Sequence, residues 1–156
     1  MRNHGYPRRS GYEREEHEWY VEPPWSVHQI LDQLTAEGRP IEGVVLDPCC
    51  GGGTIVSVCL SRGLVAKGID YIDRSSGEVR DLRTITEPLH NVISNFPFSK
   101  AEEFVRHLLP LVRRRMLLIL PLTFLERVKP FRACTARCPR GFAIRVPRGH
   151  RCHPAF

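Results

Sequence analysis

The sequence predicts one α/β domain built on a doubly wound, mainly parallel sheet. Apolar runs rich in β-branched residues alternate with helical stretches, and a glycine-rich turn joins the first run to the helix after it. Residues 43–47, 54–62 and 64–70 thereby read as strand, helix and strand, a unit that forces parallel strands joined by a right-handed crossover. A chain of 156 residues has room for one such domain.

The remaining elements follow from local signals. Two prolines and Ser26 start a helix that ends near Glu37, before a glycine and a proline. Turn residues and short apolar runs then predict a brief strand over 78–81 and another over 91–94. These segments extend the alternation of strands and helices.

The next helix and strand are predicted from charge and apolar pattern. Ser99 is expected to cap the helix, Glu102 and Glu103 lie in its first turn, and the arginines of 113–115 are expected at its end. Residues 116–120 are apolar throughout, as in a strand buried on both faces.

Composition divides the chain into three parts. We expect a flexible arm over 1–18, a folded core over 19–132 and a basic tail over 133–156. The formal charge is +6, and residues 127–156 contain eight Lys or Arg and no acid. This excess suits a polyanionic partner. Residues 142–146 predict either an edge strand or a loosely ordered segment, so the sheet is expected to be incomplete at its C-terminal edge.

Cysteine usage predicts a reducing, cytoplasmic compartment. Cys49 and Cys50 are adjacent, which is poor geometry for a disulfide. Residues 1–19 lack the apolar core of a secretory signal, and no apolar run is long enough to span a membrane. The spacing of the potential zinc ligands in the tail is irregular, so free thiols are expected there and no metal site. Those residues are Cys134, Cys138, His150, Cys152 and His153.

A glycine-rich turn marks a candidate binding site. Asp47 ends the first predicted strand, and three glycines, 51–53, lead into the following helix. Ligands of open parallel sheets bind at this edge, where glycines admit a ligand to the backbone and to the first helical amides. The turn is neither a P-loop nor a complete dinucleotide fingerprint, and a tight turn formed for packing is the alternative interpretation. Asp70 ends the second strand beside it, where a carboxylate can accept hydrogen bonds from ribose hydroxyls.

These residues resemble the S-adenosylmethionine-dependent methyltransferases, whose first motif reads Asp-Pro-x-x-Gly-x-Gly and whose second is an acid ending the next strand. The resemblance implies the class I, Rossmann-like methyltransferase fold and S-adenosylmethionine as cofactor. It also implies that Gly51 and Gly53 face the methionine part of the cofactor. By the same resemblance, Asp47, followed by Pro48, is expected to support the loop, and Asp70 is expected to hold the ribose.

Two further cofactor contacts are implied by the same resemblance. An acid with an apolar neighbour after the third strand contacts adenine in the family, and Asp81-Leu82 matches it, with Asp73 and Glu78 as alternatives. Upstream, Glu22 and the proline after it resemble a Glu-Thr-Pro segment that closes over the cofactor.

A second motif, Asn95-Phe96-Pro97-Phe98, follows the fourth predicted strand at the same edge of the sheet. The exocyclic amine of a nucleobase is a poor nucleophile, because its lone pair is delocalised into the ring. Two hydrogen-bond acceptors aimed at the amine hydrogens draw its lone pair out of conjugation with the ring and make it nucleophilic. An aromatic ring stacks on the extruded base. Asn95 offers the side-chain acceptor and Phe98 the stacking face.

This motif resembles the Asn/Asp-Pro-Pro-Tyr/Phe motif of amino-group methyltransferases that act on adenine in DNA. Phe96 replaces a proline of the family, where the backbone carbonyl of this residue is the second acceptor, so the group itself is retained. Pro97 still disfavours the helical region for residue 96. The resemblance covers roughly residues 19–132.

The resemblance implies methyl transfer from S-adenosylmethionine to adenine in DNA, with nucleic acid as the partner. Relatives that act on RNA bases or on protein glutamine provide alternative acceptors. A degenerate member that keeps the fold as a non-catalytic binding module is a further alternative, in which Asn95 is only a turn residue before a helix.

Overall fold

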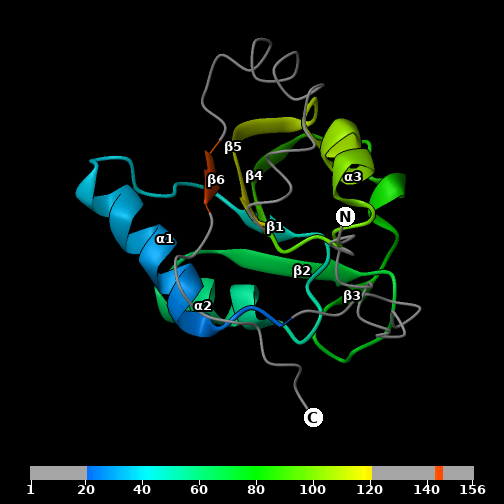
Figure 1. Cartoon of the computed structure of the whole chain (residues 1–156), viewed down its shortest axis with the longest axis horizontal. Helices are drawn as coiled ribbons and strands as arrows, with labels where there is room; N and C mark the ends of the chain where they lie inside the picture. The colour runs from blue at the N-terminus through cyan, green and yellow to red at the C-terminus, as the bar shows by residue number, and fades with distance from the viewer. Residues whose placement is uncertain (1–20, 121–142, 146–156) are drawn as a thin grey trace, which may run out of the picture.

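The computed structural model describes residues 21–120 and 143–145. The strands form one six-stranded sheet, and helices cover both of its faces (Figure 1). The elements are α1 (Pro24–Ala36), β1 (Val45–Asp47), α2 (Thr54–Ser61), β2 (Ala66–Asp70), β3 (Glu78–Val79), η1 (Leu82–Thr84), β4 (Leu89–Ser94), α3 (Ala101–Leu108), β5 (Val112–Ile119) and β6 (Ala143–Arg145).

The sheet has the strand order β3-β2-β1-β4-β5-β6, and every neighbouring pair is parallel. This is the doubly wound order, so the predicted fold class is confirmed. Val45 of β1 pairs with Ala66 of β2 on one side and with Asn91 of β4 on the other. The direction of winding therefore reverses between β1 and β4, and the carboxyl ends of these strands frame the crevice in which such sheets bind ligands.

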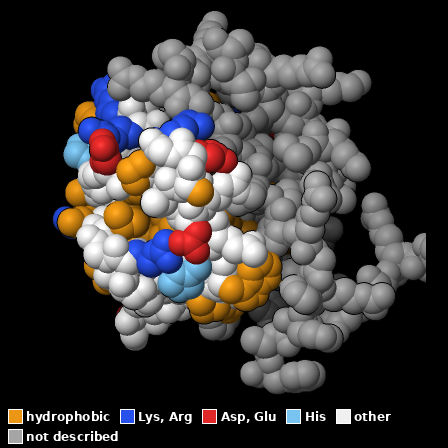
Figure 2. Space-filling view, turned by 90° about the vertical axis from the view of Figure 1, so that its left-hand side faces the viewer, with side chains coloured by type: hydrophobic (Ala, Val, Ile, Leu, Met, Phe, Trp, Pro, Cys, Tyr) orange, Lys and Arg blue, Asp and Glu red, His pale blue; other side chains and the backbone are white. Residues whose placement is uncertain are grey.

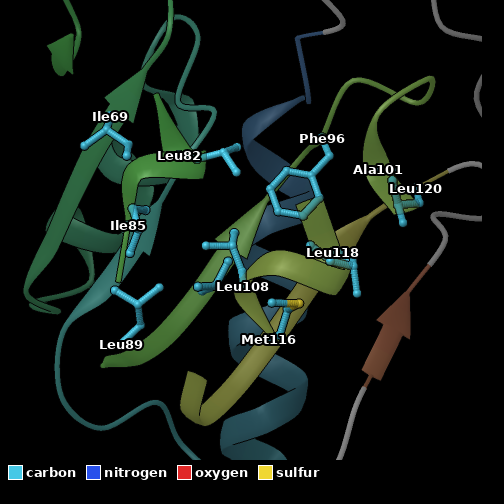
Figure 3. Packing of buried hydrophobic residues seen from close by; sticks show 12 residues of the cluster. Ile69, Leu82, Ile85, Leu89, Phe96, Ala101, Leu108, Met116, Leu118 and Leu120 are labelled. Carbon is cyan, nitrogen blue, oxygen red and sulfur yellow. The ribbon is translucent and has the colours of Figure 1, made fainter. Parts of the chain in front are cut away.

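Two apolar cores lie on the two faces of the sheet. Alternation along the strands sends neighbouring residues to opposite faces, so Val92 and Ile93 of β4 belong to different cores. Figure 3 shows the first of these, the α3-side core. It consists of Ile69, Leu82, Ile85, Leu89, Val92, Phe96, Ala101, Val105, Leu108, Met116, Leu118 and Leu120. The second, the α1-side core, consists of Val27, Ile30, Leu31, Leu34, Ile41, Val45, Ile55, Val58, Cys59, Ile93, Leu117 and Ile119.

Both predicted ends of the third helix were wrong. Lys100, rather than Ser99, is the N-cap residue, and no side chain caps the helix. The helix ends at Leu108, because a turn containing Pro110 follows, in which the Leu111 amide donates to the Leu108 carbonyl at 2.9 Å. The arginines of 113–115 therefore lie in β5 instead of a helical turn. The acidic first turn was predicted correctly.

The segment 143–145 forms the edge strand β6, pairing with β5 through Leu117 and Ala143. Of the two alternatives for this part of the tail, the edge strand is confirmed. The arm over 1–18 and the candidate zinc ligands of the tail lie outside the described residues. Within 21–120 and 143–145, no helix is long and apolar enough to cross a membrane, and no group of three or more His, Cys, Asp or Glu side chains is placed to hold a metal ion.

Candidate functional site

Asp47 is a buried acid at the carboxyl end of β1, with 1% of its surface exposed. Its Oδ1 accepts hydrogen bonds from the Ser94 hydroxyl at 2.7 Å and from the Cys49 amide at 3.2 Å. Its Oδ2 is buried with no hydrogen-bond partner among the described residues. Burial raises the pKa of Asp47 to about 7, the Ser94 hydroxyl lowers it, and the negative charge of nearby Glu22 raises it further. The structure thus holds an acceptor atom ready for a polar group.

The glycine loop adopts a backbone that favours glycine. Gly51 and Gly53 have φ values of 50° and 78°, and Gly53 is the N-cap of α2. The Gly51 amide donates to Asp70 Oδ2 at 2.9 Å, and the Ile72 amide donates to Asp70 Oδ1 at 3.0 Å. The acid that ends β2 is therefore fixed directly against the loop after β1.

Cys50 fills a narrow space beneath this loop. A Cβ added at Gly68 would lie 2.7 Å from Cys50 Cβ, and one at Gly77 would lie 2.7 Å from Cys50 Sγ. Cys50 is 3% exposed, and burial raises its pKa to about 11. These contacts support packing as the role of this thiol, because a neutral buried thiol is a poor nucleophile.

Glu22 is the residue whose place in the site differs most from expectation. It is 9% exposed, and its Oε2 accepts a hydrogen bond from Asn95 Nδ2 at 3.2 Å. The Ile55 amide and the Thr54 hydroxyl, at the start of α2, also act on this carboxylate and lower its pKa. Burial raises the pKa of Glu22, and the hydrogen bonds that it accepts offset part of this rise. Glu22 therefore connects the segment before α1, the start of α2 and the motif after β4.

The motif after β4 divides its side chains between the core and the site. Phe96 is 1% exposed and meets Phe104 edge to face, with ring centroids 5.6 Å apart and an interplanar angle of 85°. Figure 3 shows the Phe96 ring among the residues of the α3-side core. Asn95, Pro97 and Phe98 are half-buried. The phenylalanine that replaces the family's proline is therefore a core residue, and the site can use only its backbone.

Asp81 and Leu82 are placed less favourably for a ligand. Asp81 caps η1 by accepting from the Arg83 amide at 2.9 Å, and it pairs with the Arg83 guanidinium at 2.6 Å. The hydrogen bond from the Arg83 side chain is the main reason why the pKa of Asp81 is lowered. Leu82 is 4% exposed, within the α3-side core. Of the alternatives, Asp73 accepts from the Ser75 amide at 2.9 Å and Glu78 opens β3.

The structure brings five of the predicted positions together at one edge of the sheet: Glu22, Asp47, Gly51, Asp70 and Asn95. The contact between Glu22 and Asn95 was not predicted, since 73 residues separate them. The proline pair after Glu22 is the local signal that places this residue immediately before a helix.

Comparison with known proteins finds similar structures but no similar sequences. No protein-family model matches the sequence, and no curated protein matches it. A protein of Pyrococcus horikoshii provisionally assigned as an RNA methyltransferase is similar in structure, with a TM-score of 0.58 at 17% identity. The alignment covers 80% of this chain and 76% of that protein. This likeness confirms the class I, Rossmann-like methyltransferase fold.

A second similar structure is magnesium protoporphyrin IX methyltransferase from Synechocystis PCC 6803 with bound S-adenosylmethionine. Its TM-score is 0.49 at 20% identity, and the alignment covers 64% of this chain. The chain spans only 59% of the length of that enzyme.

Proposed function

We propose that this protein transfers a methyl group from S-adenosylmethionine to the exocyclic amino group of a nucleobase, with adenine in DNA as the first acceptor. The observation that carries this proposal is the hydrogen bond from Asn95 to Glu22 beside the glycine loop. It joins the motif suited to amine activation to the part of the fold where a cofactor binds.

The residues present fit the proposed cofactor. Asp47 Oδ2 is buried and has no hydrogen-bond partner within 21–120 and 143–145, so it requires a donor, and the ammonium group of the cofactor's methionine part is one. Gly51 and Gly53 present backbone without side chains. Each carboxylate oxygen has more than one lone pair, so Asp70 retains acceptor capacity for ribose hydroxyls beside its two amide contacts. When bound, S-adenosylmethionine supplies an electrophilic methyl group on a sulfonium.

Asn95 prepares the acceptor amine. Glu22 accepts from the Asn95 Nδ2 atom and so orients the carboxamide, whose Oδ1 is the acceptor for the amine hydrogen in this proposal. The Phe96 carbonyl provides the second acceptor, and Phe98 provides the stacking face for the base. Together they draw the amine lone pair out of conjugation and toward the methyl group. The proton released from the amine passes to water, so no strong base is needed in the site.

RNA is the second candidate acceptor. The similar protein of Pyrococcus horikoshii is provisionally an RNA methyltransferase, and it is the similar structure with the higher TM-score of the two described above. Both acceptors present an exocyclic amine, so the same residues serve either. The sequence also places eight Lys or Arg and no acid in residues 127–156, a charge suited to phosphate in DNA or RNA.

Transfer of labelled methyl groups to three acceptor classes tests the proposal. Single-stranded DNA, RNA and a glutamine-containing protein are each incubated with labelled S-adenosylmethionine, and the modified product is identified by mass spectrometry. We expect N-methyladenine in nucleic acid, abolished by Asn95→Ala but unaffected by Gln33→Ala, which removes an exposed amide from α1. Unchanged methylation by Asn95→Ala would exclude the assigned role. Cofactor binding without transfer to any acceptor would favour a binding module.

A further inference from the structure

A basic pocket lies at the edge of the sheet opposite the candidate site. It has a volume of about 300 Å³ and is lined by the segment between α1 and β1 and by residues in the first halves of β4 and β5. We name it the amino-edge pocket. Its lining residues are Arg39, Pro40, Glu42, Asn91, Arg114 and Arg115.

The arginines of this pocket keep hydrogen-bond donors for a ligand. Arg114 Nη1 pairs with Glu42 Oε2 at 2.5 Å, and Arg115 Nη1 donates to the carbonyls of Arg39 and Pro40. Each guanidinium has five N–H donors, so these contacts use only part of the set. The Arg39 guanidinium makes no hydrogen bond or ion pair with the described part of the chain. Guanidinium forks match phosphate oxygens in geometry and charge.

The charge in the described core is distributed unevenly. Residues 21–120 contain eleven Lys or Arg and twelve Asp or Glu, yet the amino-edge pocket alone has three arginines against one acid. Figure 2 shows basic and acidic side chains mixed among the described residues on one face of the molecule. The candidate site, by contrast, holds buried acids. The amino-edge pocket therefore attracts a backbone phosphate more strongly than the candidate site does.

We propose that the amino-edge pocket binds a phosphate of the nucleic-acid backbone a few nucleotides away from the target base. Asn91 in the pocket precedes Asn95 by four residues along β4, which corresponds to about 13 Å at roughly 3.3 Å per strand residue. Stacked nucleotides rise by about 3.4 Å along a strand. A nucleic acid must pass around the helices that cover the sheet, so at least about four nucleotides separate the bound phosphate from the target base. This inference rests on the proposed function, because it requires a nucleic acid as the acceptor.

Binding of a labelled single-stranded oligonucleotide to the full chain, measured by anisotropy over a range of salt, tests the pocket. Arg39→Gln and Arg114→Gln should each weaken binding by roughly three- to tenfold and lower the salt slope by about 0.7. Glu42→Gln should strengthen oligonucleotide binding, because it removes the negative charge from the pocket and releases Arg114 from its ion pair. Affinity for S-adenosylmethionine should not change in any of the three variants.

An ion pair on α3 gives matched controls. Arg106 Nη2 lies 2.8 Å from Glu102 Oε1, and both side chains are exposed like those of the Arg114 and Glu42 pair. Arg106→Gln and Glu102→Gln change the net charge equally and should leave oligonucleotide affinity within twofold of the wild type. A position-specific effect with opposite signs at 39 and 42 supports the pocket.

The outcomes separate this proposal from the proposed function. If the wild type binds the oligonucleotide and the pocket variants match their α3 controls, the pocket proposal alone is overturned. If the wild type binds neither DNA nor RNA at low salt, both proposals are overturned. If the pocket variants bind the oligonucleotide as the wild type does but respond differently to added inorganic phosphate, the pocket binds a small anion and its assignment to the nucleic-acid backbone is wrong.

Discussion

Replacement of Asp47 by Asn separates stability from binding at the candidate site. The pKa of this carboxyl rises from 3.8 to about 7 on folding, mainly through burial. A rise of about three units corresponds to about 4 kcal/mol at 1.36 kcal/mol per unit. Because the folded-state pKa is raised, this contribution to stability is fully present below about pH 4 and is lost as the pH rises through about 7.

Asp47→Asn should therefore unfold at a higher urea concentration than the wild type at pH 8, with a gain of up to about 4 kcal/mol. At pH 4 the two proteins should differ little, because Asn keeps an acceptor for the Ser94 hydroxyl and the Cys49 amide. The same variant should bind S-adenosylmethionine more weakly, since it no longer offers a charge to the ammonium group. A variant less stable than the wild type at pH 8 would refute this reasoning, and Asp32→Asn provides an exposed control.

Two further predictions concern the motif after β4. Glu22→Leu should lower kcat by about 10- to 100-fold, because the Asn95 amide loses a buried partner worth about 1–3 kcal/mol, whereas Glu22→Gln keeps an acceptor and most of the turnover. Equal kcat for the two variants in steady-state assays would contradict this positioning role. Phe96→Ala should destabilise the protein by about 3–5 kcal/mol in urea unfolding, because its buried ring packs on Phe104. Leu60→Ala, at a side chain 54% exposed, is the control, and a similar loss there would show that burial is not the cause.

Local signals in the sequence were sufficient for the half of the fold that carries the glycine loop. The β1, α2 and β2 segments were predicted because apolar runs and glycine punctuation are properties of neighbouring residues. The predicted end of α3 was wrong because the arginines of 113–115 have the charge that is expected at the C-terminal end of a helix. Pro110 was the overriding signal, since proline cannot continue a helix without losing a hydrogen bond.

Contacts between distant segments could not be predicted from spacing. The carboxylate of Glu22 reaches Asn95 only because α1 packs against α2 on one face of the sheet. The core position of Phe96 likewise depends on Phe104 of the next helix. The motifs therefore indicated the candidate site, while the tertiary structure determined which of its side chains touch one another.

Calorimetric titration of the full chain with S-adenosylmethionine tests most directly whether this edge of the sheet is a cofactor site. We expect saturable binding at one site, weakened by Asp47→Asn and retained by Asn95→Ala. The absence of binding at millimolar cofactor would contradict the account, because both the proposed transfer and the assigned role of the Asp47 carboxylate depend on it.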